Sequence, residues 1–249
     1  MSVLTTERRD DVLVLTLDRP ERRNALDRAL TDALSAALDE LDDDPSLHAG
    51  VLAANGPVFC AGTDLHETAS PATDRGGEYG LVRRRRTTPL VAAVEGAALG
   101  GGFELVLACD LVVAGADARF GLPEVARGLV ATCAGLFRAP DRLPPAVATQ
   151  LLLTGDPVDA ERAHQVGLVN VLTKAGGALD GALALAGRIT RNSPDAVSAT
   201  LRAVHESRGP AEAVGWTATD HAIAQVSLSP DKAEGVTAFF EKRPPRWSR

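Results

Sequence analysis

The sequence predicts an α/β protein in which short buried strands alternate with helices. Three observations support this class. Short apolar runs recur along the first half of the chain, leucines between two of them follow a helical spacing, and proline, glycine or charged residues separate the segments. Strands that alternate with helices need crossover connections, which makes their pairing mainly parallel. A chain of 249 residues can bury such a core.

The first strand and helix are expected near the N-terminus. Residues 12–17 form an apolar run between acidic residues and Arg19-Pro20, as is typical of a strand covered on both faces. Leucines then recur at intervals of four and three, which predicts an amphipathic helix that stops in the acidic stretch 42–45. These leucines are Leu26, Leu30, Leu34, Leu38 and Leu41.

The alternation continues along the chain. Residues 50–53, 90–94 and 111–113 are apolar and strand-like, and a helix is expected to begin at about Gly101. A polar, glycine-containing section spans about residues 70–80. This order extends the α/β pattern through the middle of the chain.

The strand signals stop after about residue 190. Ser193-Pro194 and Ser229-Pro230 each offer an N-cap followed by proline at the first helical position. We therefore expect residues 1–192 to form the core that carries the site. Residues 193–249 are expected to form a helical region that packs on the core or on another subunit.

Composition disfavours several classes of function. The net charge of −7 removes the positive field that nonspecific nucleic-acid binding requires. Charges such as Glu95, Glu104 and Asp110 interrupt the apolar stretches, so none reaches the roughly 20 residues needed for membrane insertion. Three cysteines and an N-terminus without an apolar signal segment predict a cytoplasmic protein with reduced thiols.

The most informative segment is the glycine-rich stretch 96–104, which follows a strand and opens a helix. Glycines let a ligand approach the backbone, and the N–H groups of a first helical turn attract negative charge. Its spacing matches neither a phosphate loop nor the dinucleotide fingerprint. Taken alone, these glycines could equally mark close helix packing.

A second turn, residues 59–65, lies just beyond the strand-like segment 50–53. It could present another backbone N–H to the same place, and two convergent donors would stabilise charge on a carbonyl oxygen. The alternative is a simple turn capped by Asp64.

Two glutamates are candidates for acid and base chemistry. Glu104 lies on the helix opened by the glycines, and Glu124 follows the strand-like segment 111–113. Paired carboxylates in one apolar cleft can share acid and base roles. Most glutamates are solvated, but Glu104 stands among Phe103, Leu105 and Val106, where an unused charge would be costly to bury.

Other chemistries find little support in the sequence. The histidines and cysteines lack metal-ligand spacing, so no metal is predicted. A Gly-x-Ser-x-Gly turn is absent, and no histidine is implied as a base for Cys60. We interpret the charge run 83–86 as a solvated helix face.

Taken together, these segments resemble the crotonase superfamily of enoyl-CoA hydratases and isomerases over almost the whole chain. The strongest parts are residues 59–64, 97–110 and 120–128, with weaker support from 153–156, 163–170 and 238–243. The resemblance implies a spiral of ββα units with a helical C-terminal region for oligomerisation, assembled as a trimer or hexamer.

The resemblance also implies roles for individual residues. The backbone N–H groups of Thr63 and Gly101 would hold a thioester carbonyl oxygen. Glu104 would chiefly orient and deprotonate the water that attacks C3, and Glu124 would chiefly give a proton to C2. No cofactor is expected, because coenzyme A is part of the acyl-CoA substrate. Residues expected to bind the substrate or its coenzyme A are Arg22, Arg23, Ala25, Ala61, Asp64, Leu65, Gly100 and Lys242.

The expected activity is that of an enoyl-CoA hydratase, as in fatty acid β-oxidation. An enoyl-CoA isomerase, a carnitinyl-CoA-type dehydratase and a non-catalytic acyl-CoA binding protein remain alternatives. After Gly128 the segment 129–135 departs from the glycine-rich pattern of many hydratases. This departure leaves the preferred acyl-chain length open.

Overall fold

The computed structural model describes residues 2–64, 67 and 69–248. Its main sheet has six strands in the order β1-β2-β3-β6-β8-β11, and every neighbouring pair is parallel except β1 with β2. The α/β class with mainly parallel pairing is therefore confirmed. The strands are β1 (Leu4–Arg9), β2 (Val12–Leu17), β3 (Ala49–Ala54), β6 (Leu90–Val94), β8 (Leu111–Gly115) and β11 (Val171–Thr173).

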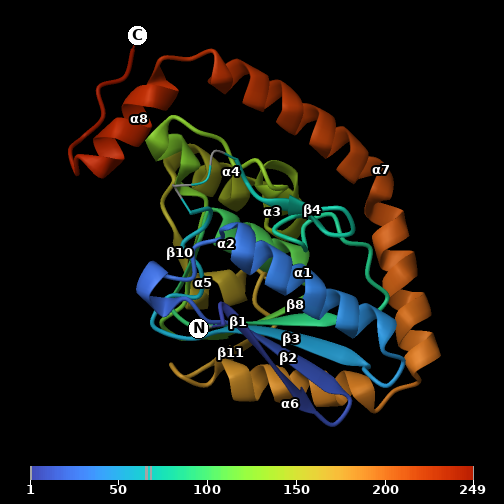
Figure 1. Cartoon of the computed structure of the whole chain (residues 1–249). Coiled ribbons are helices and arrows are strands. Elements are labelled where there is room, and N and C mark those ends of the chain that lie inside the picture. The colour runs from blue at the N-terminus through green and yellow to red at the C-terminus, as the bar shows by residue number, and fades with distance from the viewer. Residues whose placement is uncertain (1, 65–66, 68, 249) are drawn as a thin grey trace.

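Helices cover both faces of this sheet (Figure 1). The alternation in β2 explains how: its leucines belong to the same core as the leucines of α1 (Arg28–Asp43), whereas its valines pack toward α6 (Ala178–Thr190). Side chains of successive strand residues point to opposite faces, so both faces are apolar. The small residues Ala178, Ala182 and Ala186 let α6 lie close to the sheet.

The edge strand β1 was not expected from the sequence. Only Leu4 of its six residues is buried, so the strand lacks the apolar run that marks its neighbours. It pairs antiparallel with β2 through a tight turn in which Asp10 adopts a left-handed conformation. An exposed edge of this kind carries a polar sequence.

Two smaller sheets shape the region around the glycine-rich segment. One joins β10, β9 and β7, and the other joins β4 and β5. Short helices complete the first 165 residues. These elements are β7 (Ala97–Leu99), β9 (Arg119–Gly121), β10 (Val158–Asp159), β4 (Ala72–Thr73), β5 (Gly77–Glu78), the 3-10 helices η1 (Pro20–Arg22) and η2 (Pro123–Arg127), and the helices α2 (Gly101–Ala108), α3 (Gly135–Arg142), α4 (Pro145–Thr154) and α5 (Ala160–Gln165).

The C-terminal residues are helical, as expected. The long helix α7 (Pro194–Ser227) runs along one side of the molecule, and α8 (Asp231–Phe240) packs at its end near η2 (Figure 1). Ser193 caps α7 through a hydrogen bond from the Ala196 amide, whereas α8 begins after Pro230 and not after Ser229. Within the described residues no strand follows β11; a domain boundary at residue 192 remains a prediction.

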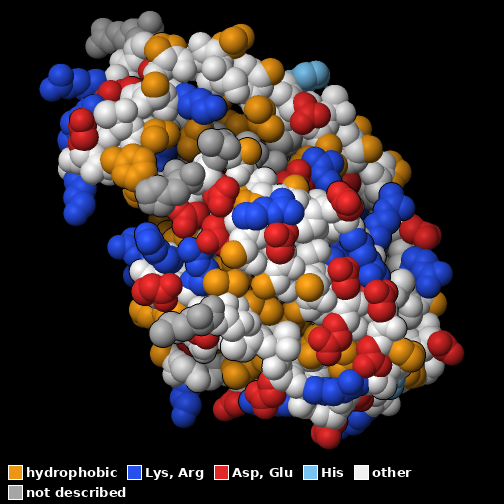
Figure 2. Space-filling model, viewed as in Figure 1, with side chains coloured by type: hydrophobic (Ala, Val, Ile, Leu, Met, Phe, Trp, Pro, Cys, Tyr) orange, Lys and Arg blue, Asp and Glu red, His pale blue; other side chains and the backbone are white. Residues whose placement is uncertain are grey.

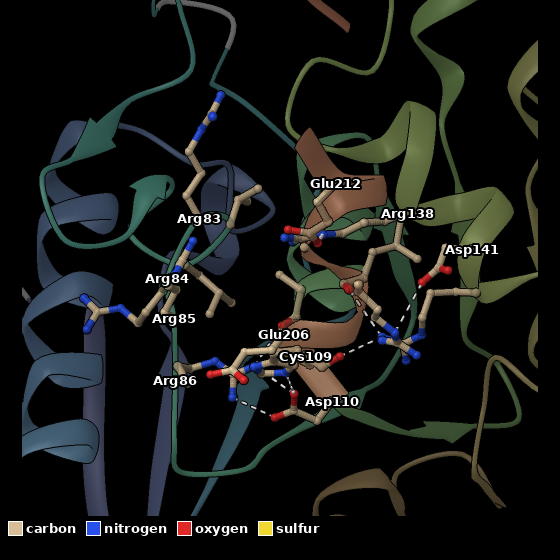
Figure 3. Close-up of a pocket in the computed structure, with 18 of the residues that line it drawn as sticks. Arg83, Arg84, Arg85, Arg86, Cys109, Asp110, Arg138, Asp141, Glu206 and Glu212 are labelled. Carbon is tan, nitrogen blue, oxygen red and sulfur yellow. Dashed lines mark hydrogen bonds and ion pairs between the residues drawn. The ribbon is translucent and has the colours of Figure 1, made fainter. Parts of the chain in front are cut away.

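The arginine run 83–86 is not the solvated helix face that we expected. It lies in turns and an extended segment, and the side chains of Arg84 and Arg86 are buried. Arg84 pairs with Asp42 at 3.1 Å. Arg86 pairs with Asp110 at 2.7 Å (Figure 3). The run looked solvated because its acidic partners are remote in sequence.

In the described part of the chain, no helix is both long and apolar enough to span a membrane.

Candidate active site

Backbone hydrogen bonds fasten three chain segments around the glycine-rich turn. The Leu99 amide donates to the Cys60 carbonyl, and the Gly100 amide donates to the Gly121 carbonyl, both at 2.9 Å. Gly100 has a φ of +54°, which favours glycine, and it turns the chain from β7 into α2. This turn places the start of α2 beside both the 59–63 segment and β9.

Two unpaired backbone N–H groups lie on adjacent turns of this site. Leu26 bridges the 62–64 segment by donating to the Gly62 carbonyl and accepting from the Asp64 amide, so the Thr63 amide in between faces away from Leu26. Neither Thr63 nor Gly101 donates its amide hydrogen to an acceptor in the described residues. A Cβ atom on Gly62 would lie only 3.1 Å from the Gly101 nitrogen, which shows how closely the turns approach.

Glu104 stands in the first turn of α2 and is buried. Its Oε1 accepts hydrogen bonds from the backbone amides of Cys133 at 2.7 Å and Gly135 at 3.0 Å. These donors orient the carboxyl group and leave Oε2 for another partner. Burial, and secondarily the charge of Glu124, raise the pKa of Glu104.

Glu124 enters the same site from η2. A Cβ atom on Gly100 would lie 3.1 Å from its Oε1, and its Oε2 is buried without a hydrogen-bond partner in the described residues. Burial raises the pKa of Glu124, and Arg127 opposes that shift. A buried carboxyl oxygen without a partner is costly, so a water molecule or a substrate group is expected there.

The two carboxyl groups therefore form an electrostatic pair with raised pKa values. Burial disfavours both negative charges, and the charge of Glu124 further disfavours that of Glu104. Near neutral pH such a pair holds protons jointly, as a donor and an acceptor of protons would need to. The structure thus brings together the four residues expected from the sequence to act on the reacting atoms: Thr63, Gly101, Glu104 and Glu124.

Several of the residues expected to bind coenzyme A lie close to the 59–64 segment of the site. The Ala61 amide donates to the Arg23 carbonyl at 3.0 Å, and Asp64 lies 3.6 Å from Arg19. Arg22 and Arg23 are exposed at the end of η1, with Ala25 following them. Lys242 follows α8, and in the described part of the chain its amide donates to the Phe239 carbonyl and not to this group. Leu65 lies outside the described residues.

Sequence reasoning missed the sole tyrosine. Tyr79 is buried, and its hydroxyl lies 2.8 Å from Thr63 Oγ1 and 3.1 Å from Ser70 Oγ. A Cβ atom on Gly101 would lie 2.6 Å from the same hydroxyl. The residue falls in a section that reads only as polar and glycine-rich, so nothing in the sequence signals its place.

No group of three or more histidine, cysteine, aspartate or glutamate side chains is placed to hold a metal ion in the described part of the chain. Cys60, Cys109 and Cys133 are buried and free, and burial raises the pKa of the Cys60 thiol to about 12. A thiol of this kind is a poor nucleophile at neutral pH.

Sequence comparison relates the whole chain to known enzymes. The family described as enoyl-CoA hydratase/isomerase matches residues 7–249. The 2,3-dehydroadipyl-CoA hydratase of Escherichia coli is 36% identical, over 98% of this chain and 98% of its own length. A carnitinyl-CoA dehydratase of Proteus mirabilis is also 36% identical, over 98% of this chain and 97% of its own length.

Solved structures agree with this relationship. The crystal structure of a carnitinyl-CoA hydratase from Mycobacterium avium matches with a TM-score of 0.93 and 40% identity, covering 100% of this chain and 99% of that one. An enoyl-CoA hydratase structure from Mycobacterium tuberculosis matches with a TM-score of 0.81 and 47% identity, again over 100% and 99%. The crotonase-like fold and its helical C-terminal region are therefore confirmed.

Proposed function

Because the chain belongs to the enoyl-CoA hydratase/isomerase family, we propose that it is an enoyl-CoA hydratase. It would add water reversibly and syn across the C2–C3 double bond of a 2-enoyl-CoA to give a 3-hydroxyacyl-CoA, as in fatty acid β-oxidation. The observation that carries this proposal is the pair formed by buried Glu104 and half-buried Glu124, which lies beside two amides that have no acceptor within the described residues. The names of the similar enzymes, which are hydratases and a dehydratase, support the same reaction class.

The proposed chemistry begins at the thioester carbonyl. Its oxygen accepts hydrogen bonds from the amides of Thr63 and Gly101, and the N-terminal end of α2 adds partial positive charge. Polarisation of the carbonyl makes C3 electrophilic. Negative charge that reaches the oxygen during the reaction is stabilised by the same donors.

The two carboxyl groups then handle one water molecule. Glu104 chiefly orients this water and takes its proton as the oxygen bonds to C3, while the π electrons move toward the carbonyl oxygen. Glu124 chiefly gives a proton to C2, which completes the addition. The addition leaves Glu104 protonated and Glu124 ionised, and passage of that proton to Glu124 resets the pair. The product differs from the substrate only by one water, so no oxidant or reductant is consumed, and coenzyme A enters as part of the substrate.

Binding and assembly follow as further parts of the proposal. Arg22, Arg23 and Lys242 would contact the phosphates of coenzyme A, with Ala25, Ala61, Asp64, Leu65 and Gly100 along the thioester arm. Free buried cysteines fit a reducing cytoplasm.

A trimer or hexamer would cover the exposed apolar side chains at the C-terminal end. Orange side chains gather there around α8 (Figure 2), and Leu228, Phe239, Phe240 and Trp247 are exposed. Apolar patches on a free surface usually mark an interface. Sedimentation would show a particle of three or six chains, whereas a monomer at micromolar concentration would contradict this part of the proposal.

The first test is hydration of crotonyl-CoA and longer 2-enoyl-CoAs, followed as loss of the conjugated thioester absorbance. Glu104→Gln and Glu124→Gln should each lower kcat by about 100-fold or more, because positioned acid–base groups contribute about that much. Far-UV circular dichroism would verify folding. Well-folded wild type that turns over no chain length would overturn the hydratase proposal.

A carnitinyl-CoA-type dehydratase is the second candidate, because relatives with that name match the whole chain. It would act on carnitinyl-CoA and leave crotonyl-CoA untouched. An isomerase would move a double bond but add no water, so it would not hydrate the enoyl-CoA. Its activity would also survive Glu104→Gln. A binding protein would hold acyl-CoA equally well with and without Glu104.

A further inference from the structure

The hydroxyl of Tyr79 is the polar group that the chemistry above leaves without a role. The residue adopts a left-handed conformation with φ of +56°, which is strained for a residue other than glycine. Its amide donates to the Pro71 carbonyl at 2.8 Å, which holds the backbone. Strain of this kind persists only where the surroundings enforce it, and it is frequent at functional sites.

Tyr79 directs its hydroxyl to the boundary between the two turns with unpaired amides. Thr63 Oγ1 lies 2.8 Å away on one turn, and a Cβ atom on Gly101 of the other turn would come within 2.6 Å. The same ring would also clash with any side chain at position 101. The phenol thus lies beside both Thr63 and Gly101, the two residues whose amides would hold the carbonyl oxygen.

The hydrogen-bond capacity of the phenol leaves a donor available. A tyrosine hydroxyl has one proton and can accept two hydrogen bonds. The hydroxyls of Thr63 and Ser70 can both donate to it, at 2.8 and 3.1 Å. In that arrangement the phenolic proton is left for a third partner. The Cys133 side chain takes that place in the structure, and a carbonyl oxygen of a ligand, which is a stronger acceptor than a thiol sulfur, would replace it.

The protonation state suits a neutral donor. Burial, with smaller contributions from Cys133 and Glu104, raises the pKa of Tyr79 well above its ordinary value. The phenol therefore keeps its proton at neutral pH.

We propose that Tyr79 is a third hydrogen-bond donor to the carbonyl oxygen of the bound thioester, beside the amides of Thr63 and Gly101. This inference rests on the proposed function, because it assigns a catalytic residue to the same site. The donor would act in the transition state, where the oxygen carries the most negative charge. Loss of one such donor typically costs about 100- to 1,000-fold in kcat.

The test compares variants that separate the hydroxyl from the ring. Tyr79→Phe removes only the oxygen and should lower kcat for crotonyl-CoA hydration by about 100-fold, with KM changed far less. Thr63→Val keeps the backbone amide but removes a hydroxyl that orients the phenol, so a smaller loss in kcat is expected. Thr63→Ser should recover most of that loss.

A spectroscopic readout tests the inference independently of turnover. A conjugated cinnamoyl-CoA should shift its absorbance to longer wavelength on binding, because donors polarise the carbonyl. Tyr79→Phe should reduce this shift, and Thr63→Val should reduce it less. A merely structural role for the phenol would leave the shift unchanged.

The outcomes distinguish the two proposals. Active wild type with unchanged kcat and unchanged shift in folded Tyr79→Phe would overturn the donor role and leave the hydratase function standing. Inactive wild type would overturn the hydratase function, while the absorbance shift would still decide the role of Tyr79. If Tyr79→Phe fails to fold, an unchanged shift in Thr63→Val would overturn the inference.

Discussion

At the scale of single residues, Glu104 and Glu124 show how the site trades stability for reactivity. Both carboxyl groups are taken from water, and the pKa of each is raised by burial. A raised folded-state pKa means that the ionised form is less stable in the folded protein than in the unfolded chain. At neutral pH the pair therefore lowers the free energy of unfolding.

Glu104→Gln should stabilise the protein more at pH 8 than at pH 5. The stability contributed by a group with a raised pKa is present below its unfolded value of about 4.3 and is lost as pH rises through the folded value. Glutamine has no such loss, and its side-chain oxygen can still accept from the Cys133 and Gly135 amides. We expect a gain on the order of 1–3 kcal/mol at pH 8.

Urea denaturation at both pH values measures this difference. Glu161→Gln, on the exposed surface of α5, is the matched control and should change the free energy of unfolding by less than about 0.5 kcal/mol at either pH. An equal effect of Glu104→Gln at pH 5 and pH 8 would show that its charge is not the cause.

The site could be predicted only in part from single residues. Glycine spacing and a glutamate in an apolar stretch indicated the 96–104 segment, and the structure brings it next to Thr63 and Glu124. The Cys133 and Gly135 amides, which orient Glu104, could not be predicted from the sequence. Almost every residue carries a backbone N–H donor, and only the fold determines which donors face the carboxyl group. The left-handed Tyr79 has no local sequence signal either.

At the scale of secondary-structure elements, a glycine allows α7 to meet α3. Gly215 is buried against Phe137, and Trp216 packs edge-on to the same ring at 5.1 Å between centroids. The guanidinium carbon of Arg83 lies over the ring of Trp216, 3.4 Å from its centroid. This cluster is a main attachment of the long helix to the core.

Gly215→Ala should loosen that attachment. Its Cβ would lie 2.3 Å from Cγ of Phe137, so the ring must move, and overpacking of this kind typically costs about 1–3 kcal/mol. Gly187→Ala in α6 is the matched control, because nothing lies within 4 Å of its Cβ and no proline follows it. Alanine favours a helix by about 1 kcal/mol over glycine, so this control should stabilise the protein.

Thermal unfolding of the two variants would give melting temperatures that move in opposite directions. Two equal decreases would instead indicate that alanine destabilises either helix whatever its neighbours, and that contact with Phe137 is not the reason for Gly215. In Gly215→Ala, a change in Trp216 fluorescence would report that the packing around Phe137 has been altered.

Elements differed in how far the sequence could predict them. Strands β2, β3, β6 and β8 are apolar because both faces are covered, and this burial made them recognisable. The strands β7, β9 and β10 have two or three residues, too few to show a period. These unpredicted strands nevertheless position Gly100 against Gly121.

At the scale of the whole molecule, Asp110 links the sheet to the C-terminal helix. It follows α2 and pairs with buried Arg86, accepts from the Leu90 amide at 2.8 Å, and lies 3.0 Å from His205 of α7 (Figure 3). Residues separated by more than 90 positions thus share one carboxylate. Such long-range pairing explains why the arginine run looked solvated in the sequence.

Asp110→Asn should destabilise the protein by about 3–5 kcal/mol, because it leaves the Arg86 charge buried and unpaired. His205→Gln removes only the contact from α7, where the histidine side chain is 32% exposed, and should cost about 1 kcal/mol or less.

Burial alone would raise the pKa of Asp110, but Arg86, His205 and the Leu90 amide hold it well below its ordinary value. The stability that Asp110 contributes is therefore present above its unfolded pKa of about 3.9 and is lost as pH falls through the lower folded value. Urea unfolding should show the same difference in free energy of unfolding between wild type and Asp110→Asn from pH 6 to pH 8. This difference should become smaller in strong acid, once the pH falls below the unfolded pKa of about 3.9. Equal stability of the two proteins at pH 7 would mean that Arg86 finds another partner and that Asp110 does not join the sheet to α7.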